Sequence, residues 1–297
     1  MSDHPPIVIL TALELEYKAV RDRLSGIREP PPAAGTRFEV GSLGDGEVVL
    51  AVTGQGNHGT AVLAERAIRV FSPGAVLFVG VAGALTDSVR LGDIVVATHV
   101  YAYHGGAART GGPASRPRVW EIDHALEQTA RRLARRDDDG PAIHFGPVAS
   151  GEILHDARVS EPLRWIREHY DDALAIEMEA AGVARAGHLS SVPVAVVRAI
   201  SGRADGTQAG GDDAGWQPRA VADAGSFAVA NAASFAVALA GELITQRRTG
   251  RDAGPTKHDV RVRTKGGRHG AVAGILGGGV HNHNTRPGRS SGPGREE

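Results

Sequence analysis

An acidic cluster followed by a strand and a polar loop is the part of the chain best suited to chemistry. Residues 174–205 read LAIEMEAAGVARAGHLSSVPVAVVRAISGRAD, with Glu177-Met178-Glu179 at the start of a helical pattern. A strand is predicted at Val194–Ile200, so that its polar end and the acidic cluster can meet. A carboxylate beside a methionine suits a ribose, because the carboxylate accepts hydrogen bonds from vicinal hydroxyls and the thioether packs on the sugar face. The other interpretation is a solvent-exposed helix start, where acidic residues are common.

Composition limits the classes of protein that the chain can belong to. It has 297 residues, of which 41% are hydrophobic and 23% charged, with a net charge of −1, which suits one large globular domain or two small ones. It has no cysteine, which excludes disulfides and thiolate metal sites, and no metal site or cofactor is expected. No apolar run near 18 residues and no basic leader are found, so we expect no membrane span and a cytoplasmic location.

The last part of the chain differs from the rest in charge and glycine content. Residues 246–297 hold 11 lysines and arginines against 4 acidic residues, a net charge of +7, and 12 of the 40 glycines. Such a segment buries little apolar surface, so residues 246–297 are predicted to be a disordered tail after a domain of residues 1–245. The tail has no aromatic side chain to stack on bases, which makes nucleic-acid binding an unfavoured function. Its segment His269–Gly277 interleaves glycine with small apolar residues, which leaves self-association open beside a flexible linker.

Strands and helices alternate along residues 1–245, which predicts an α/β domain with helices on both faces of a mixed sheet. Strands are expected at Ile7–Leu10, Phe38–Leu43, Glu47–Thr53, Val76–Val79, Asp93–His99 and Val194–Ile200, the second and third forming a hairpin turned by Gly44-Asp45-Gly46. Helices are expected at Glu14–Leu24, Gly59–Val70, Ala125–Arg136, Glu161–His169 and Trp216–Ile244. Residues Gly105–Arg118 and Asp137–Pro141 are expected to be loops.

Three further segments carry polar or glycine-rich patterns where strands are expected to end, and the carboxyl ends of strands are where α/β sheets form sites. The first is Thr11–Glu16, the second is Thr53–Gly59 with Gly54, Gly56 and Asn57, and the third is Val79–Leu85 with Ala82 and Gly83. Glycines before a helix let backbone N–H groups approach an anion or water, although turns before helices often carry glycine without such a role.

Together these motifs resemble the nucleoside phosphorylase superfamily, in particular its methylthioadenosine/S-adenosylhomocysteine nucleosidase-like branch and the related domains of bacterial signalling and defence proteins. The resemblance is carried by Glu177-Met178-Glu179 with the strand ending Arg198-Ala199-Ile200-Ser201, by Val79–Leu85 with Leu91–Val96, and by Ala149–Leu154. It covers residues 7–242 and implies a single-domain, three-layer α/β/α fold on a mixed sheet.

The resemblance also implies a role for each matched position. Glu16 would direct the attacking water, Glu179 would hold the 2′ and 3′ hydroxyls, and Met178 would pack on the sugar. The implied substrate-binding set is Ala82, Gly83, Leu154, Glu177, Met178, Glu179 and Ser201, with Gly54, Gly56 and Asn57 in a water or anion loop. Asp93 is expected to have a structural role, and the partners implied are a small purine nucleoside or nucleotide and a second copy of the chain in a homodimer.

One position departs from the family pattern, because Gly202 stands where the family has an aspartate that protonates the purine or binds its protonated form. Asp205 is the first candidate to replace that acid, ahead of Asp212 and Asp213, and the alternative is that Asp205 is a helix cap or a solvated loop residue. The first loop lacks the arginine that suits phosphate, and Val81 stands where a serine would help to bind it. The sequence therefore predicts a purine nucleosidase, with a catalytically impaired nucleoside-binding module and a phosphate-dependent phosphorylase as alternatives.

Overall fold

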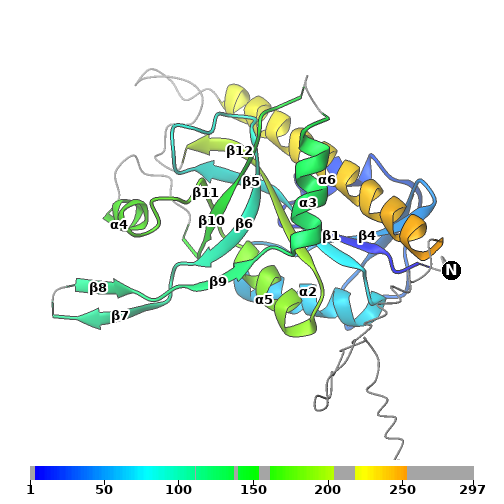
Figure 1. The fold of residues 1–297 in the computed structure, drawn as a ribbon, viewed down its shortest axis with the longest axis horizontal. Helices are drawn as coiled ribbons and strands as arrows, with labels where there is room; N and C mark the ends of the chain where they lie inside the picture. Colours follow the sequence, from blue (N-terminus) through cyan, green and yellow to red (C-terminus); the bar gives the residue numbers. More distant parts are fainter. Residues whose placement is uncertain (1–3, 111, 137–139, 154–160, 204–217, 253–297) are drawn as a thin grey trace, which may run out of the picture. The chain divides into compact units, whose positions relative to one another are not determined.

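One large sheet covered by helices on both faces forms the body of the protein (Figure 1). The computed structural model describes residues 4–110, 112–136, 140–153, 161–203 and 218–252. Among these, the sheet has the strand order β11-β10-β6-β12-β5-β1-β4-β3-β2, with β9 paired to β6. The mixed α/β/α architecture predicted from the sequence is confirmed.

The first half of the sheet is built around parallel strands. β1 (Ile7–Thr11) lies between β4 (Gly46–Val52) and β5 (Ala75–Ala84), and β5 pairs in parallel with β12 (Val194–Arg203). β3 (Glu39–Leu43) pairs antiparallel with β4, which confirms the predicted hairpin. A short edge strand, β2 (Ser25–Arg28), follows it and was not predicted, because its sequence SGIR has little strand propensity.

The second half of the sheet runs in the opposite direction. β6 (Ile94–Ala102) pairs antiparallel with β12 and in parallel with β10 (Ile143–Ser150), which pairs in parallel with β11 (Ala175–Glu177). β11 also pairs antiparallel with β5. In the described part of the chain, the sheet therefore closes into a ring made of β11, β10, β6, β12 and β5. The ring brings residues from distant parts of the sequence to one end of the sheet.

The two faces of the sheet bury separate clusters of apolar side chains. α2 (Asn57–Phe71) and α5 (Ala180–Ser190) cover one face, and their alanines and glycines let them approach each other and the sheet closely. α1 (Glu14–Arg21), α3 (His124–Ala134) and α6 (Pro218–Asp252) cover the other. A smaller cluster lies under α4 (Glu161–His169) and includes Tyr103 and Tyr170.

The long helix α6 is long and apolar enough over Gly225–Arg247 to meet a length and composition test for a membrane span. This apolar run corrects the expectation from the sequence that no such run exists. However, 56% of its apolar 18-residue stretch is buried inside the protein, and Ala228, Ala232 and Leu239 pack against the sheet. The apolar character of α6 is thus explained by core packing. The helix continues past Thr245, the predicted domain boundary, to Asp252, and the rest of the tail lies outside the described residues.

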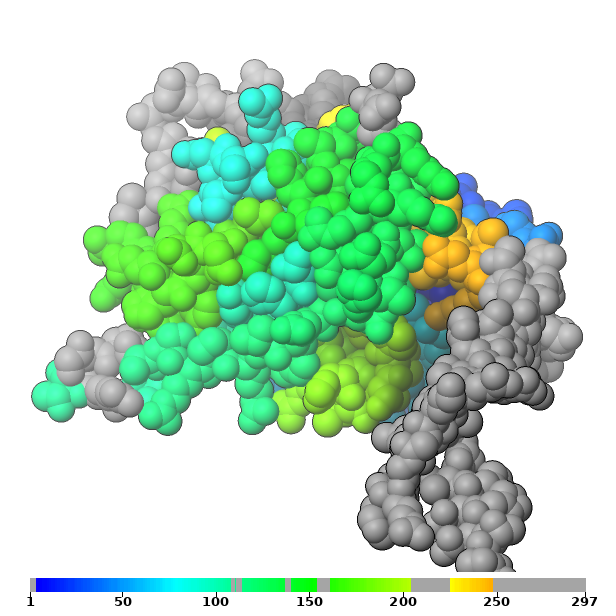
Figure 2. Space-filling model, viewed as in Figure 1, coloured from blue at the N-terminus to red at the C-terminus, as the bar shows by residue number. Residues whose placement is uncertain are grey.

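One of the predicted loops contains strands instead. Within Gly105–Arg118, the structure has β7 (Gly106–Arg109) and β8 (Gly112–Ser115), which pair only with each other, and β9 (Arg118–Glu121) begins at its end. The β7–β8 hairpin projects from the body, as the ribbon and the space-filling drawing show from the same side (Figure 1 and Figure 2). Similarly, β12 does not end at Ile200 but continues to Arg203, with a bulge between Ile200 and Gly202.

Candidate active site

Glu16 is buried at the start of α1, directly after β1, and its carboxylate is held by backbone donors. Its Oε2 accepts hydrogen bonds from the N–H groups of Ala12 and Leu13, each at 3.0 Å, and its Oε1 accepts one from Val81 N at 2.9 Å. Burial raises the pKa of Glu16, while Arg198 and these three N–H groups act in the opposite direction. A carboxylate has about four acceptor sites, so one site on Oε1 stays open.

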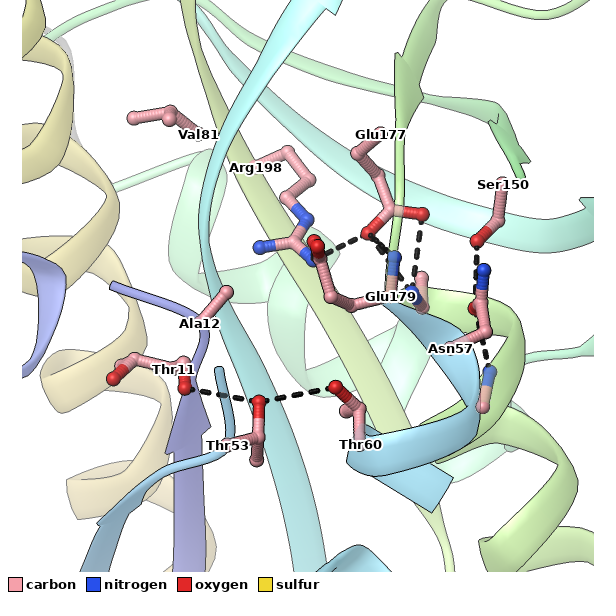
Figure 3. A network of polar contacts seen from close by, with 12 residues as sticks. Thr11, Ala12, Thr53, Asn57, Thr60, Val81, Ser150, Glu177, Glu179 and Arg198 are labelled. Atoms are coloured by element: carbon pink, nitrogen blue, oxygen red, sulfur yellow. Dashed lines mark hydrogen bonds and ion pairs between the residues drawn. The ribbon is translucent and has the colours of Figure 1, made fainter. Parts of the chain in front are cut away.

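Glu177 ends strand β11 and shares its carboxylate between the following turn and Arg198 (Figure 3). Oε2 accepts from Glu179 N at 3.0 Å and Ala180 N at 2.8 Å, and Arg198 Nη2 lies 2.5 Å from the same oxygen. Oε1 accepts from Ala180 N at 3.1 Å. The side chain is 2% exposed. Glu177 therefore shapes the turn that carries Glu179, and its carboxylate is occupied by protein donors.

Glu179 is the N-cap residue of α5 and has the most available carboxylate of the cluster. Its Oε1 accepts a hydrogen bond from Gly56 N at 3.0 Å, whereas its Oε2 lies 3.8 Å from Arg198 Nη2, beyond hydrogen-bond distance. Burial, and next the negative charge of Glu177, raises the pKa of Glu179 to about 7, against the opposing effect of Arg198. Within the described part of the chain, Oε2 is the oxygen left to accept bonds from a ligand.

Arg198 lies among the three carboxylates, and it was named in the matched strand but assigned no role from the sequence. It projects from the middle of β12, is fully buried, and its guanidinium lies 4.1 Å from the centre of the Phe78 ring. A Cβ at Gly80 would lie 2.3 Å from Arg198 Nη1 and 2.4 Å from Glu16 Oε1, so glycine is needed there for both side chains to fit. The sequence does hold a signal for Arg198, because it is a charged residue inside an apolar strand. A buried charge needs a partner.

The glycine loop after β4 joins the carboxylate cluster to the end of β10 (Figure 3). Gly54 and Gly56 have φ of 76° and 94°, values that favour glycine. Asn57 N donates to Glu152 Oε1 at 3.2 Å, and its Nδ2 donates to Gly151 O at 2.7 Å. Its Oδ1 accepts from Ser150 Oγ at 3.1 Å and Gly182 N at 2.9 Å. Asn57 therefore fixes three segments to one another.

The ends of β5 and β12 present small residues side by side. Ala82 pairs with Ile200 and Gly83 pairs with Gly202, while Gly83 also faces Ile176 of β11. Gly202 does not have a positive φ, and a Cβ built there would meet no atom of the described residues within 4 Å. Ser201 is half-buried at the bulge before it, and Met178 is half-buried between the two glutamates. Leu154 and Asp205, with Asp212 and Asp213, lie outside the described residues.

Two cavities in the described part of the chain lie near these elements, and the second of them reaches Ile153, just after β10. A groove of about 960 Å³ lies between β9 and α5, and its lining does not include Glu16, Glu177 or Glu179. A second cavity, of about 590 Å³, is bounded by the root of the β7–β8 hairpin, α4 and Ile153, and Tyr103 and His104 line it. Glu152 N donates to His104 Nδ1 at 3.2 Å, which joins the wall of this cavity to the segment after β10. Asp93, as expected, is structural, accepting from Arg90 N and contacting His144 Nε2, both at 2.9 Å.

Comparison with known proteins agrees with the motifs. The family model of the phosphorylase superfamily matches residues 6–240. A 5'-methylthioadenosine/S-adenosylhomocysteine nucleosidase of Maridesulfovibrio salexigens is 31% identical over 212 residues, 68% of this chain and 89% of the relative. One from Staphylococcus epidermidis is 31% identical over 206 residues, 67% of this chain and 87% of the relative.

Solved structures show the same fold. The Helicobacter pylori 5'-methylthioadenosine/S-adenosylhomocysteine nucleosidase with butyl-thio-DADMe-Immucillin-A has a TM-score of 0.70 and 23% identity, covering 81% of this chain and 99% of that one. One assignment follows from the strand order, from the carboxylate cluster at the ends of β1 and β11, and from the matched residues. The chain belongs to the phosphorylase superfamily, in its methylthioadenosine/S-adenosylhomocysteine nucleosidase-like branch.

Proposed function

We propose that the protein hydrolyses the N-glycosidic bond of an adenosine-type nucleoside or nucleotide and releases the purine base. The observation that carries this proposal is that three buried glutamates differ in whether the protein fills their acceptor sites. Glu177 has its carboxylate filled by backbone and Arg198, while Glu16 and Glu179 each keep an open acceptor site. The named activity of the relatives, which act on methylthioadenosine and S-adenosylhomocysteine, supports the same substrate class.

In this mechanism the sugar binds against Glu179 and Met178. The open Oε2 of Glu179 accepts from the 2′ and 3′ hydroxyls, and the half-buried thioether packs on the ribose face. The purine lies along the small residues Ala82 and Gly83. Positive charge develops on the ribose as the C1′–N bond breaks, and the surrounding carboxylates stabilise that charge. Ser201 at the bulge is in position beside the base.

Water, rather than phosphate, is the proposed nucleophile. Glu16 accepts a proton from the water or orients it through the remaining acceptor site of Oε1. The glycine loop offers little to an anion, because Gly56 N donates to Glu179 and Asn57 N donates to Glu152. Val81 supplies no hydroxyl, and the described first loop has no arginine. These features favour hydrolysis over the phosphorylase alternative.

A nucleoside-binding module without turnover is the second candidate, and Gly202 is the observation that favours it. Glycine has no side chain to protonate a departing purine, and no described atom lies within 4 Å of a Cβ built at this position. General acid catalysis contributes about 10²–10⁴-fold in rate, so its loss leaves a slow enzyme or a binding protein. Asp205 remains the proposed replacement acid.

Adenine release distinguishes these functions. The full chain is incubated with methylthioadenosine, S-adenosylhomocysteine, AMP and ATP, with and without phosphate, and the products are separated by chromatography. Free adenine with free ribose product, at a rate independent of phosphate, supports the nucleosidase. A ribose-1-phosphate product contradicts it in favour of the phosphorylase. Calorimetric binding without release contradicts it in favour of the binding module.

The assembly and location are proposed from the same family relation. We propose a homodimer in which the projecting β7–β8 hairpin reaches the partner, and a cytoplasmic location. Tyr103 and His104, at the root of this hairpin, line the second cavity and are candidates to contact the 5′ group of the substrate. Tyr101 donates to Asp172 Oδ2 at 3.0 Å, so we do not assign its hydroxyl to the 5′ group.

A further inference from the structure

Glu179 is the N-cap residue of α5, but its side chain does not cap that helix. An N-cap side chain normally accepts a hydrogen bond from the backbone N–H of the second or third helical residue, because these groups have no partner inside the helix. In α5 those residues are Ala181 and Gly182, and within the described residues the carboxylate of Glu179 accepts from neither. It is directed toward the glycine loop instead, where its Oε1 accepts from Gly56 N at 3.0 Å.

Ser150 and Asn57, which belong to two other elements, cap α5 in place of Glu179 (Figure 3). Ser150 Oγ, at the end of β10, accepts from Ala181 N at 3.0 Å. Asn57 Oδ1, at the start of α2, accepts from Gly182 N at 2.9 Å and from Ser150 Oγ at 3.1 Å. The hydroxyl of Ser150 is buried and uses both its proton and a lone pair, so the two caps form one connected unit.

The close approach of α2 and α5 makes this exchange of caps possible. A Cβ at Gly182 would lie 2.2 Å from the backbone oxygen of Asn57, so glycine is needed for the two helix starts to meet. Each helix start then accepts from the other, because Asn57 accepts from α5 while Glu179 accepts from Gly56, the N-cap residue of α2. In the described part of the chain, this arrangement leaves Oε2 of Glu179 for a ligand.

Loss of either cap would expose an N–H group at the positive end of the α5 dipole, which attracts a carboxylate. The carboxylate of Glu179 would then be drawn onto its own helix, away from a bound sugar. We propose that Ser150 and Asn57 are positioning residues for Glu179, which keep its carboxylate facing the ribose hydroxyls by capping α5 in its place. The inference rests on the sugar contact of the proposed function.

The test measures whether Ser150 affects ligand affinity through the ribose hydroxyls. Ser150 is the better member to change, because Asn57 also bonds Gly151 and Glu152. Formycin A, the C-nucleoside counterpart of adenosine, resists hydrolysis, and its 2′,3′-dideoxy derivative lacks the two hydroxyls. In calorimetry with the full chain, Ser150→Ala should weaken formycin A binding at least about tenfold, because charge-assisted bonds are lost. Binding of the dideoxy derivative should change by less than about threefold.

Thr129→Val is the matched control, because it removes another buried hydroxyl without touching α5. Thr129 Oγ1 donates to Ala125 O at 2.8 Å, within α3 on the other face of the sheet. The variant should lower Tm but change formycin A affinity by less than about threefold. A comparable loss of affinity in Thr129→Val, or an equal loss for both ligands in Ser150→Ala, assigns Ser150 a general structural role and overturns the inference.

A thermal double-mutant cycle tests the caps without any ligand. If Glu179 turns onto α5 when Ser150 is lost, Ser150→Ala should lower Tm less in the wild-type background than in a Glu179→Ala background. Only the second background lacks a carboxylate that can replace the hydroxyl, so we expect the full effect of a lost cap there, about 2–4 °C. A crystal structure of Ser150→Ala should show the Glu179 carboxylate bonded to Ala181 N.

These measurements separate failure of the inference from failure of the proposed function. Equal Tm losses in the two backgrounds overturn the inference, and so does unchanged formycin A binding in Ser150→Ala. If the wild-type chain binds formycin A and its dideoxy derivative equally, or binds neither, the sugar contact of the proposed function is overturned. The thermal cycle then decides alone whether Ser150 and Asn57 hold the carboxylate of Glu179.

Discussion

Replacing Glu179 by glutamine should weaken ligand binding and at the same time stabilise the folded protein above neutral pH. In the folded chain the pKa of Glu179 is raised from 4.5 to about 7, first by burial and then by the charge of Glu177. Between these values the folded chain keeps a proton that the unfolded chain releases. Stability is therefore lost as the pH rises toward 7, and the loss is complete above it.

The size of the change in unfolding free energy follows from the pKa shift of Glu179. A shift from 4.5 to about 7 corresponds to about 3 kcal/mol of unfolding free energy. Glutamine keeps the acceptor for Gly56 N and carries no charge, so Glu179→Gln should recover up to about 3 kcal/mol at pH 8 and much less at pH 5. For a domain of this size, that is a rise in Tm of about 6–12 °C at pH 8.

The functional cost is the loss of a charge-assisted acceptor for two hydroxyls. Such bonds contribute about 1.5–3 kcal/mol each, so affinity should fall at least tenfold. Thermal unfolding at pH 5 and pH 8 measures the first effect. Calorimetry with a C-nucleoside analogue, whose C–C glycosidic bond resists hydrolysis, measures the second.

Glu177→Gln is the matched control, because the same chemical change two residues away should have the opposite effect on stability. It takes the charge from a carboxylate 2.5 Å from Arg198 Nη2 and leaves a buried guanidinium with weakened pairing. Breaking a buried pair costs about 3–5 kcal/mol, so Tm should fall at both pH values. If both variants shift Tm in the same direction at pH 8, or if Glu179→Gln binds the analogue unchanged, the assigned division of roles between the two glutamates is refuted.

Two further predictions concern the groups around Arg198. Glu16→Gln should lower kcat at least about 100-fold while affinity for the C-nucleoside stays within about threefold, because Glu16 acts on water and not on the nucleoside; an equal loss in affinity would contradict that role. Gly80→Ala should lower stability by about 1–3 kcal/mol, since its Cβ would meet both Arg198 and Glu16, and an unchanged Tm in thermal unfolding would show that this contact is not tight.

The positions of the main elements could be predicted because their periodicities are strong. The run IVIL at β1 and the helical pattern of Glu161–His169 each specify one structure, and α4 has the predicted bounds. The segment of β7 and β8 could not be predicted, since glycine and alanine carry little strand propensity and the pairing arises from the hairpin itself. Likewise, β12 extends to Arg203 because β5 continues beside it.

The sequence placed the acidic residues of the candidate site in one cluster, but their different contacts could not be read from it. The sequence identified Glu177 and Glu179 together, yet only the three-dimensional arrangement shows that Arg198 occupies the first and leaves an oxygen of the second open. That difference depends on the pairing of β11 with β10 and β5, which no local pattern encodes. Leu154 and Asp205 stay predictions, and so does the boundary at Thr245.

The β7–β8 hairpin provides the last prediction, that it is the arm of a homodimer. It pairs only with itself in the described chain, projects from the body, and its root lines the second cavity (Figure 1). Arg116 N donates to Gly105 O at 2.7 Å, so the two ends are already adjacent. Replacing residues 107–114 by Gly-Gly makes a two-residue turn and keeps Ser115, whose Oγ lies 2.5 Å from the Tyr170 hydroxyl. The shortened protein should keep its Tm within about 4 °C, equivalent to about 1–2 kcal/mol, yet elute as a monomer with reduced kcat/KM. A full-length chain that is monomeric by light scattering, or a shortened one that remains a fully active dimer, contradicts the role of the hairpin.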